Sequence, residues 1–256
     1  MSFMGIAKVN RQDLLFLAEL LEAQPEAEIL LYDLGAAYQD AGRYGEACDL
    51  YARRIETRPG DWRAWYELSR VLWREDQKED ALQVLARGQE CNPRSGHLMA
   101  QWGIFLHEQG VNRAALDKFY LALQLDSFDD PGLYHTIANL HRELSEPEKA
   151  QRGYLKALEL DPRSVGTKLD YAELLLDDRK DARAALAILD TAFRDLRSGG
   201  QRRVYQAYAS YLSSRAHLLL GEREMALLAV TRALEDNDQD WLVPTLEAQR
   251  QAVLSV

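Results

Sequence analysis

The chain has 256 residues, 47% of them apolar, and a formal net charge of −10. This composition excludes a largely disordered chain, and the acidic balance argues against binding to nucleic acid or to an anionic membrane surface. No apolar run reaches the roughly 18 residues of a membrane span, and Met1 to Asn10 lacks the features of a leader, so we expect a cytoplasmic protein without membrane insertion.

The composition favours helices over sheets. Only 15 glycines and 7 prolines interrupt a sequence in which Ala, Leu, Glu, Gln and Arg dominate. Cys48 and Cys91 show no metal-binding or redox spacing, and we interpret them as small, reduced, buried apolar residues. The starting prediction is therefore an all-α protein.

Residues 1–27 are predicted to hold a tail and an N-terminal capping helix. Leu14, Leu17, Ala18 and Leu21 recur at helical spacing behind Asn10, which we expect to be the N-cap. The terminal unit of a stacked array has an apolar face without a neighbour, and an amphipathic helix can cover it.

Small residues repeat at a fixed period along the rest of the chain. Alanines recur at intervals of 34, 34, 35, 35 and 41 residues, at Ala47, Ala81, Ala115, Ala150, Ala185 and Ala226. A second series precedes them by 12 or 13 residues, at Gly35, Ser69, Gly103, Ala138, Ala172 and Ser214. Each period accommodates two antiparallel helices that approach closely at these small residues.

Four units match one motif in phase. The first contains Leu31, Leu34, Gly35, Tyr38, Ala47, Tyr51 and Pro59. The second contains Trp65, Leu68, Ser69, Leu72, Ala81, Leu85 and Pro93. The third contains Met99, Trp102, Gly103, Leu106, Ala115, Phe119 and Ala122. The fourth contains Tyr134, Ile137, Ala138, His141, Ala150, Tyr154, Ala157 and Pro162.

These units resemble the tetratricopeptide repeat (TPR) family, whose pattern is W-x₂-L-G-x₂-Y, then A-x₃-F, then P. The resemblance extends over residues 28–238. It implies a right-handed α-solenoid of about six helix-turn-helix repeats with terminal capping helices. We assign repeats 1–5 to residues 28–200, a degenerate sixth repeat with a longer first helix to residues 201–238, and a C-terminal capping helix to residues 239–256.

The resemblance also implies where a partner would bind. The second, fifth, ninth and twelfth positions of each unit would line a concave groove. The groove residues that we single out are Tyr32, Gln39, Arg63, Tyr66, Arg70, Trp73, His97, His107, His135, Asn139 and Arg142. Arginine and aromatic side chains suit an extended acidic segment, with Arg70, Arg142, Tyr66 and Trp73 as anchors. Alternatively, this is a solvated face whose arginines pair with Glu67, Asp40, Glu108 and Glu143.

No catalytic motif, cofactor-binding loop or metal-binding pair is found in the sequence. His97, His107 and His135 could form a metal or pH-sensing site, but we interpret them as groove lining, because they lack the spacing of zinc ligands.

The sequence therefore predicts a non-catalytic adaptor that binds a protein or peptide segment, without cofactor or metal, as a monomer or as a homodimer through its terminal helices. Two alternatives stay open: a self-associating scaffold, and a regulatory or chaperone module of a secretion, pilus or signalling system.

Overall fold

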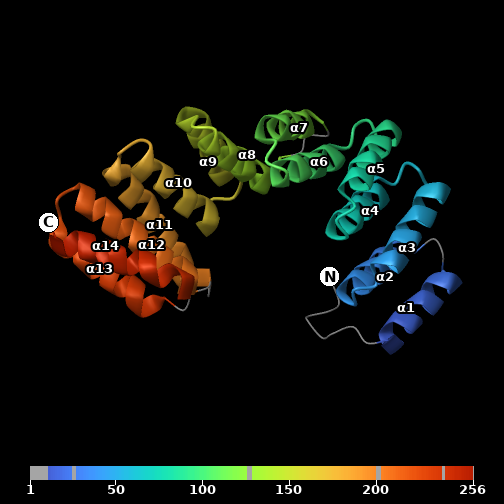
Figure 1. Cartoon of the computed structure of the whole chain (residues 1–256), viewed down its shortest axis with the longest axis horizontal. Coiled ribbons are helices and arrows are strands. Elements are labelled where there is room, and N and C mark those ends of the chain that lie inside the picture. The colour runs from blue at the N-terminus through green and yellow to red at the C-terminus, as the bar shows by residue number, and fades with distance from the viewer. Residues whose placement is uncertain (1–10, 25–26, 126–128, 200–202, 238–239, 256) are drawn as a thin grey trace. The chain divides into compact units, whose positions relative to one another are not determined.

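Paired α-helices make up most of the structure. The computed structural model describes residues 11–24, 27–125, 129–199, 203–237 and 240–255, and Figure 1 labels its helices. This part of the chain contains α-helices and one short 3-10 helix, and no strand. Turns of three or four residues join the two helices of each pair, so the partners pack antiparallel. The all-α prediction of a solenoid of helix pairs is confirmed. Asn10, the expected N-cap, lies outside the described residues. The prediction that both cysteines are buried is wrong for Cys91, which is exposed at the end of helix 78–91, and Cys48 is half-buried.

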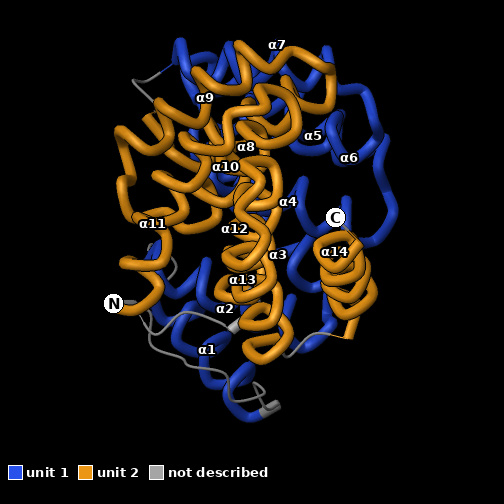
Figure 2. Tube along the Cα trace, turned by 90° about the vertical axis from the view of Figure 1, so that its left-hand side faces the viewer, with its two compact units in different colours: residues 1–128 blue, residues 129–256 orange. Residues whose placement is uncertain are grey.

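The chain divides into two compact units, which Figure 2 colours separately. Unit 1 covers residues 1–128. Its helices are α1 (Arg11–Ala23), α2 (Glu28–Asp40), α3 (Tyr44–Thr57), α4 (Trp62–Arg74), α5 (Lys78–Cys91), α6 (Gly96–Glu108) and α7 (Asn112–Gln124).

Unit 2 covers residues 129–256. Its elements are α8 (Pro131–Glu143), α9 (Pro147–Leu160), α10 (Val165–Asp177), α11 (Ala182–Gly199), α12 (Arg203–Leu219), α13 (Arg223–Asp236), the 3-10 helix η1 (Asp240–Leu242) and α14 (Val243–Ser255).

Small residues bring the two helices of a pair together. A Cβ atom at Gly103 of α6 would lie 2.4 Å from Cε1 of Phe119 in α7, and one at Gly35 of α2 would lie 2.2 Å from the Tyr51 hydroxyl oxygen in α3. The aromatic ring of the second helix therefore lies directly against the backbone of the first. The alanine of each second helix is fully buried, at Ala47, Ala81, Ala115, Ala150, Ala185 and Ala226.

The helices at the two ends continue this packing. In unit 1, α1 packs against α2, and its Leu14 joins a core cluster with Leu34 and Ala37. In unit 2, α14 packs against α13 and α12, and Gln249 Nε2 donates a hydrogen bond to Ser214 Oγ at 3.3 Å.

One region departs from the regular helix length. α11 has 18 residues and α12 has 17, whereas α8 and α10 have 13 each. The extra turns account for the longest interval in the alanine series, between Ala185 and Ala226.

None of the helices in the described residues is both long enough and apolar enough to cross a bilayer.

Candidate functional site

The predicted groove residues lie on the first helix of each pair. In unit 1 they lie on α2, α4 and α6, and we call this set the first-helix face of unit 1: Tyr32, Gln39, Arg63, Tyr66, Arg70, Trp73, His97 and His107. In unit 2 the predicted residues are His135, Asn139 and Arg142, all on α8. With the residues of α10 and α12 that they contact directly or through a shared carboxylate, they form the first-helix face of unit 2: His135, Asn139, Arg142, Asp170, Glu173, Asp177, Tyr208 and Arg215.

The α2 members of the unit 1 face are buried and hold neighbouring helices together. Tyr32 is 4% exposed and its hydroxyl donates a hydrogen bond to Asp61 Oδ1 at 2.8 Å. Burial, with the Asp61 hydrogen bond, raises the pKa of Tyr32 well above its usual range. Gln39 Nε2 donates to the Tyr51 hydroxyl at 3.2 Å. The exposed Arg63 of α4 covers Tyr32, with its guanidinium carbon 3.9 Å from the centroid of the Tyr32 ring.

Helix α4 presents a row of half-buried aromatic and basic side chains. Tyr66, Arg70 and Trp73 are each of intermediate burial. Arg70 Nη1 pairs with Glu67 Oε2 at 3.1 Å, within the same helix. Burial raises the pKa of Tyr66, and the charge of Arg70 opposes this shift. A pair such as Arg70 with Glu67, on one helix surface, contributes about 0.5 kcal/mol and leaves the guanidinium available to another carboxylate.

Aromatic stacking joins α4 to α6. The Trp73 ring lies parallel to that of Phe105, with centroids 4.0 Å apart, and Trp73 Nε1 donates to Glu108 Oε2 at 2.5 Å. The exposed His97 ring stacks on Trp62 at 4.1 Å. These contacts fix the planes of the tryptophans, so that a binding partner would meet rings that are already ordered.

The three predicted residues of unit 2 lie in a polar network. His135 Nε2 lies 2.6 Å from Asp170 Oδ2, and the Tyr154 hydroxyl donates to Asn139 Oδ1 at 2.5 Å. Arg142 pairs with Glu173 at 2.5 Å and with Asp177 at 3.5 Å.

This network continues from α10 to α12. The Tyr208 hydroxyl donates to Glu173 Oε1 at 2.7 Å, and Arg215 pairs with Asp177. Burial lowers the pKa of Arg142, but the hydrogen bond and the charge of Glu173 outweigh it, and the net shift is upward. Arg142 is thus held by carboxylates of the next helix pair. The sequence analysis considered Glu143 as a partner, but the observed ion pairs join Arg142 to Glu173 and Asp177.

Sequence reasoning missed Asp170, Glu173, Asp177, Tyr208 and Arg215. A signal for part of this set was present, because several contacts join residues 35 positions apart, which is one repeat: His135 to Asp170, Arg142 to Asp177, and Glu173 to Tyr208. Comparing charges at that separation would have found these contacts.

The remaining histidines make local contacts. His107 Nδ1 lies 3.0 Å from Asn112 Oδ1, and the buried His141 lies 2.7 Å from Glu146 Oε2. Among the described residues, no group of three or more His, Cys, Asp or Glu side chains is placed to hold a metal ion.

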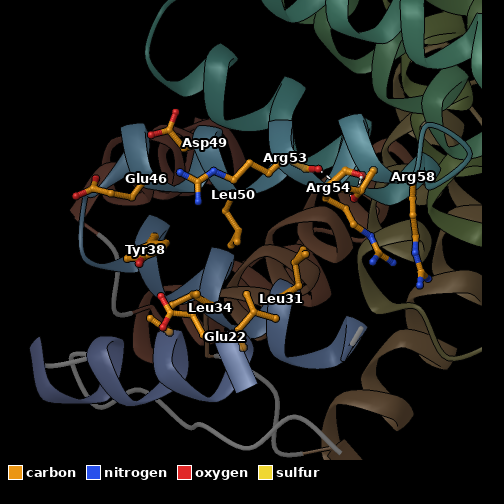
Figure 3. Close-up of a pocket in the computed structure, with 13 residues that line it drawn as sticks. Glu22, Leu31, Leu34, Tyr38, Glu46, Asp49, Leu50, Arg53, Arg54 and Arg58 are labelled. Atoms are coloured by element: carbon orange, nitrogen blue, oxygen red, sulfur yellow. Dashed lines mark hydrogen bonds between the residues drawn. The ribbon is translucent and has the colours of Figure 1, made fainter. Parts of the chain in front are cut away.

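Two cavities accompany these faces. One of about 540 Å³ lies between α1, α2 and α3, and Figure 3 shows Leu31, Leu34 and Leu50 at its centre. Its α2 residues differ from those predicted for the groove, so it is a separate feature. In unit 2, Asn139 and Arg142 line a cavity of about 400 Å³ with Asp170 and Glu143.

Comparison with known proteins defines the class to which this fold belongs. Family models described as tetratricopeptide repeat match residues 38–101 and residues 131–164. No curated protein sequence matches significantly.

Solved structures share the fold at low sequence identity. YrrB, described as a TPR protein with an unusual peptide-binding site, is 17% identical, with 77% of this chain and 97% of that chain covered and a TM-score of 0.63. Pseudomonas aeruginosa pilF is 19% identical, with 91% and 99% covered and a TM-score of 0.68. A TPR repeat-containing protein of Cytophaga hutchinsonii is 13% identical, with 91% and 93% covered and a TM-score of 0.69.

The fold and the repeat motif together define a helical repeat scaffold of the kind used in protein–protein interaction. The chain carries tetratricopeptide repeats over the two matched ranges, and solved TPR structures share its fold. Proteins of this family are generally non-catalytic interaction modules.

Proposed function

We propose that this protein is a non-catalytic adaptor that binds an acidic peptide or protein segment on the first-helix face of unit 1. The proposal rests on the exposure and the ion pairing of three side chains of α4. Tyr66, Arg70 and Trp73 are partly exposed and adjacent, and the ion pair that Arg70 makes is with Glu67 of its own helix. Aromatic and arginine side chains of this kind dominate binding energy at protein interfaces.

The charge of α4 supports an acidic partner. The helix carries Arg63, Arg70 and Arg74 against a single carboxylate, Glu67. Within the described residues, Arg63 and Arg74 form no ion pair, although both are exposed. In a chain with a net charge of −10, this local excess of positive charge favours carboxylates and would steer an acidic segment to α4.

The structural relatives are compatible with this proposal. YrrB is described as having a peptide-binding site, and a repeat scaffold of the same fold offers comparable surfaces. The predicted residues of unit 2 are less available to a partner than those of α4, because His135 and Arg142 already pair with carboxylates of the same chain. We therefore assign the anchors to Tyr66, Arg70 and Trp73, and a structural role to the α8 residues.

The test is the affinity of a peptide selected from a random display library on the full chain. We expect an acidic peptide with a Kd in the micromolar range, about −8 kcal/mol. Arg70→Ala and Trp73→Ala should each weaken binding by at least about tenfold. Arg87→Ala, an exposed arginine on the second helix α5, is the matched control and should leave the affinity unchanged.

Equal affinity in the wild type and in both α4 variants would exclude this face. A peptide that loses affinity on Arg142→Ala instead would move the site to unit 2. Concentration-dependent self-association, with no selected peptide, would favour the scaffold alternative.

A further inference from the structure

The lengthened helices α11 and α12 build a cavity in unit 2. It measures about 740 Å³ and is lined by α11, α12 and α13. Arg197, near the end of α11, and Gln206, near the start of α12, both line it. A second helix of 14 residues, as in α9 and α13, would end at Asp195 if it began at Ala182, so Arg197 belongs to the extra turn. Departures from a repeat period often mark functional surfaces.

One repeat position of α12 also holds a smaller residue than its counterparts do. The residue 16 positions before the repeat alanine is Leu31, Trp65, Met99 and Tyr134 in the first four pairs. In the sixth pair it is Ser210, whose side chain is smaller than any of these four.

The same side of α12 is polar along its length. Gln206, Ser213 and His217 line the cavity, and Ser210 falls at helical spacing between them. Ser210 is 2% exposed and its hydroxyl has no hydrogen-bond partner among the described residues. Ser210 is not among the residues that line the cavity, so the polar lining on α12 is that of Gln206, Ser213 and His217.

Three arginines from two helices converge on this cavity. Arg194 and Arg197 come from α11, and Arg232 comes from α13. None of the three forms an ion pair with a described carboxylate, although Asp190 and Asp236 also line the cavity. The lining therefore carries three guanidinium groups against two carboxylates, a balance that favours an anion.

We propose that this cavity binds a small organic compound that carries a phosphate monoester. A phosphate monoester is largely a dianion at neutral pH and has three acceptor oxygens, which match several guanidinium donors better than a carboxylate does. Phe193 and Met225 supply an apolar wall for the organic part. The volume lies within the range of small-molecule sites. This site is independent of the proposed peptide surface, because its lining residues lie on α11, α12 and α13, whereas that surface lies on α2, α4 and α6.

The experiment is isothermal titration calorimetry of the full chain with phenyl phosphate. The wild type should bind it, and Arg194→Gln and Arg232→Gln should each weaken binding by at least about tenfold, because each removes a charge-assisted contact. Both arginines are exposed, so the variants should fold, which unchanged thermal melting would show. Arg183→Gln is the matched control, since Arg183 is an exposed residue of α11 that does not line the cavity, and it should bind as the wild type does.

Three results would overturn the proposal. The first is no heat of binding for the wild type at millimolar phenyl phosphate. The second is an equal loss of affinity in Arg183→Gln, which would indicate general charge attraction. The third is binding of a phosphoserine peptide without binding of phenyl phosphate, which would make the occupant a modified side chain of a protein partner.

Discussion

Unit 1 and unit 2 are built from the same kind of helix pair, but the arginines of their first-helix faces make different ion pairs. In unit 1, α4 holds Arg70 by one carboxylate of its own helix. In unit 2, Arg142 of α8 is held by Glu173 and Asp177 of α10. One repeat motif can therefore hold an arginine of its first helix by an ion pair within that helix or by ion pairs that connect neighbouring repeats. In unit 2 the connecting carboxylate Asp177 lies 35 residues after Arg142, which is one repeat.

The interiors differ in a similar way. The repeat position of Trp65 in unit 1 holds Tyr134 in the first pair of unit 2 and Lys168 in the second. Lys168 lies one residue further from the alanine of its second helix than Trp65 or Tyr134 does, because the α10–α11 turn has one extra residue. Lys168 is 7% exposed and pairs with Asp195. Unit 2 thus contains an ion pair where unit 1 has apolar packing, and the predictions below use this contrast, from the largest effect to the smallest.

The largest effect is expected from removing one partner of this ion pair. Asp195→Ala leaves the Lys168 ammonium buried without a carboxylate and should lower the free energy of unfolding by about 3 kcal/mol. The double variant Lys168→Met, Asp195→Leu should be close to wild type, because it removes both charges. Urea denaturation followed by circular dichroism measures both. If the single and double variants are equally unstable, the packing around these side chains matters more than their charges.

The same pair predicts a pH dependence. The hydrogen bond from Lys168 lowers the pKa of Asp195, so the pair's contribution is fully present above the unfolded pKa of about 3.9 and is lost as the pH falls through the folded value. The wild type should therefore lose more stability than the double variant below about pH 4. Parallel losses would assign the acid sensitivity to other carboxylates.

A steric change in unit 1 should have the next largest effect. Gly103→Val would place a Cβ 2.4 Å from the Phe119 ring, and we expect a loss of about 2 to 3 kcal/mol. The measurement is the midpoint of thermal unfolding. Gly45→Ala is a suitable control, because nothing lies within 4 Å of a Cβ at Gly45; a similar loss in both variants would contradict the close-approach explanation.

The arginines of the two faces should differ in their effect on stability. Arg142→Ala removes two ion pairs between helices and should cost about 1 to 2 kcal/mol, whereas Arg70→Ala should cost less than about 0.5 kcal/mol. Chemical denaturation of both variants gives the comparison. If Arg70→Ala is as destabilising as Arg142→Ala, then Arg70 also stabilises the fold, and the two units do not differ in this respect.

The smallest effect is expected in the turns, where the two units behave alike. Asp76 in unit 1 and Ser145 in unit 2 have positive φ angles of 60° and 58°, at the turn position where Gly42 and Gly110 occur. Asp76→Gly and Ser145→Gly should each stabilise the protein by about 0.5 kcal/mol, because relief of backbone strain exceeds the entropy cost of glycine. The thermal midpoint should rise slightly for both; a fall would show that the side chains make stabilising contacts.

Much of the fold could be predicted from the sequence, and less of the site. The alanine and small-residue series locate the helix pairs because close packing allows few alternatives at those positions, as Gly103 and Phe119 illustrate. Ser210 was visible in the sequence, but its lack of a hydrogen-bond partner depends on the side chains around it.

The partners of surface side chains were harder to predict. Arg142 could reach Glu143, Glu173 or Asp177, and the choice depends on the distance between helices. The same holds for the cavity arginines of α11 and α13, which converge only when those helices pack against α12.

The most direct test of the central claim, that the first-helix face of unit 1 is open to a partner, uses the five tryptophans as reporters. Their indole N–H signals in ¹⁵N-labelled protein can be followed by NMR during titration with the selected acidic peptide. We predict that the signals of Trp62 and Trp73 shift in proportion to bound peptide, while those of the buried Trp65 and of Trp241 in unit 2 stay in place. A shift of Trp241 with no change at Trp62 and Trp73 would contradict this assignment.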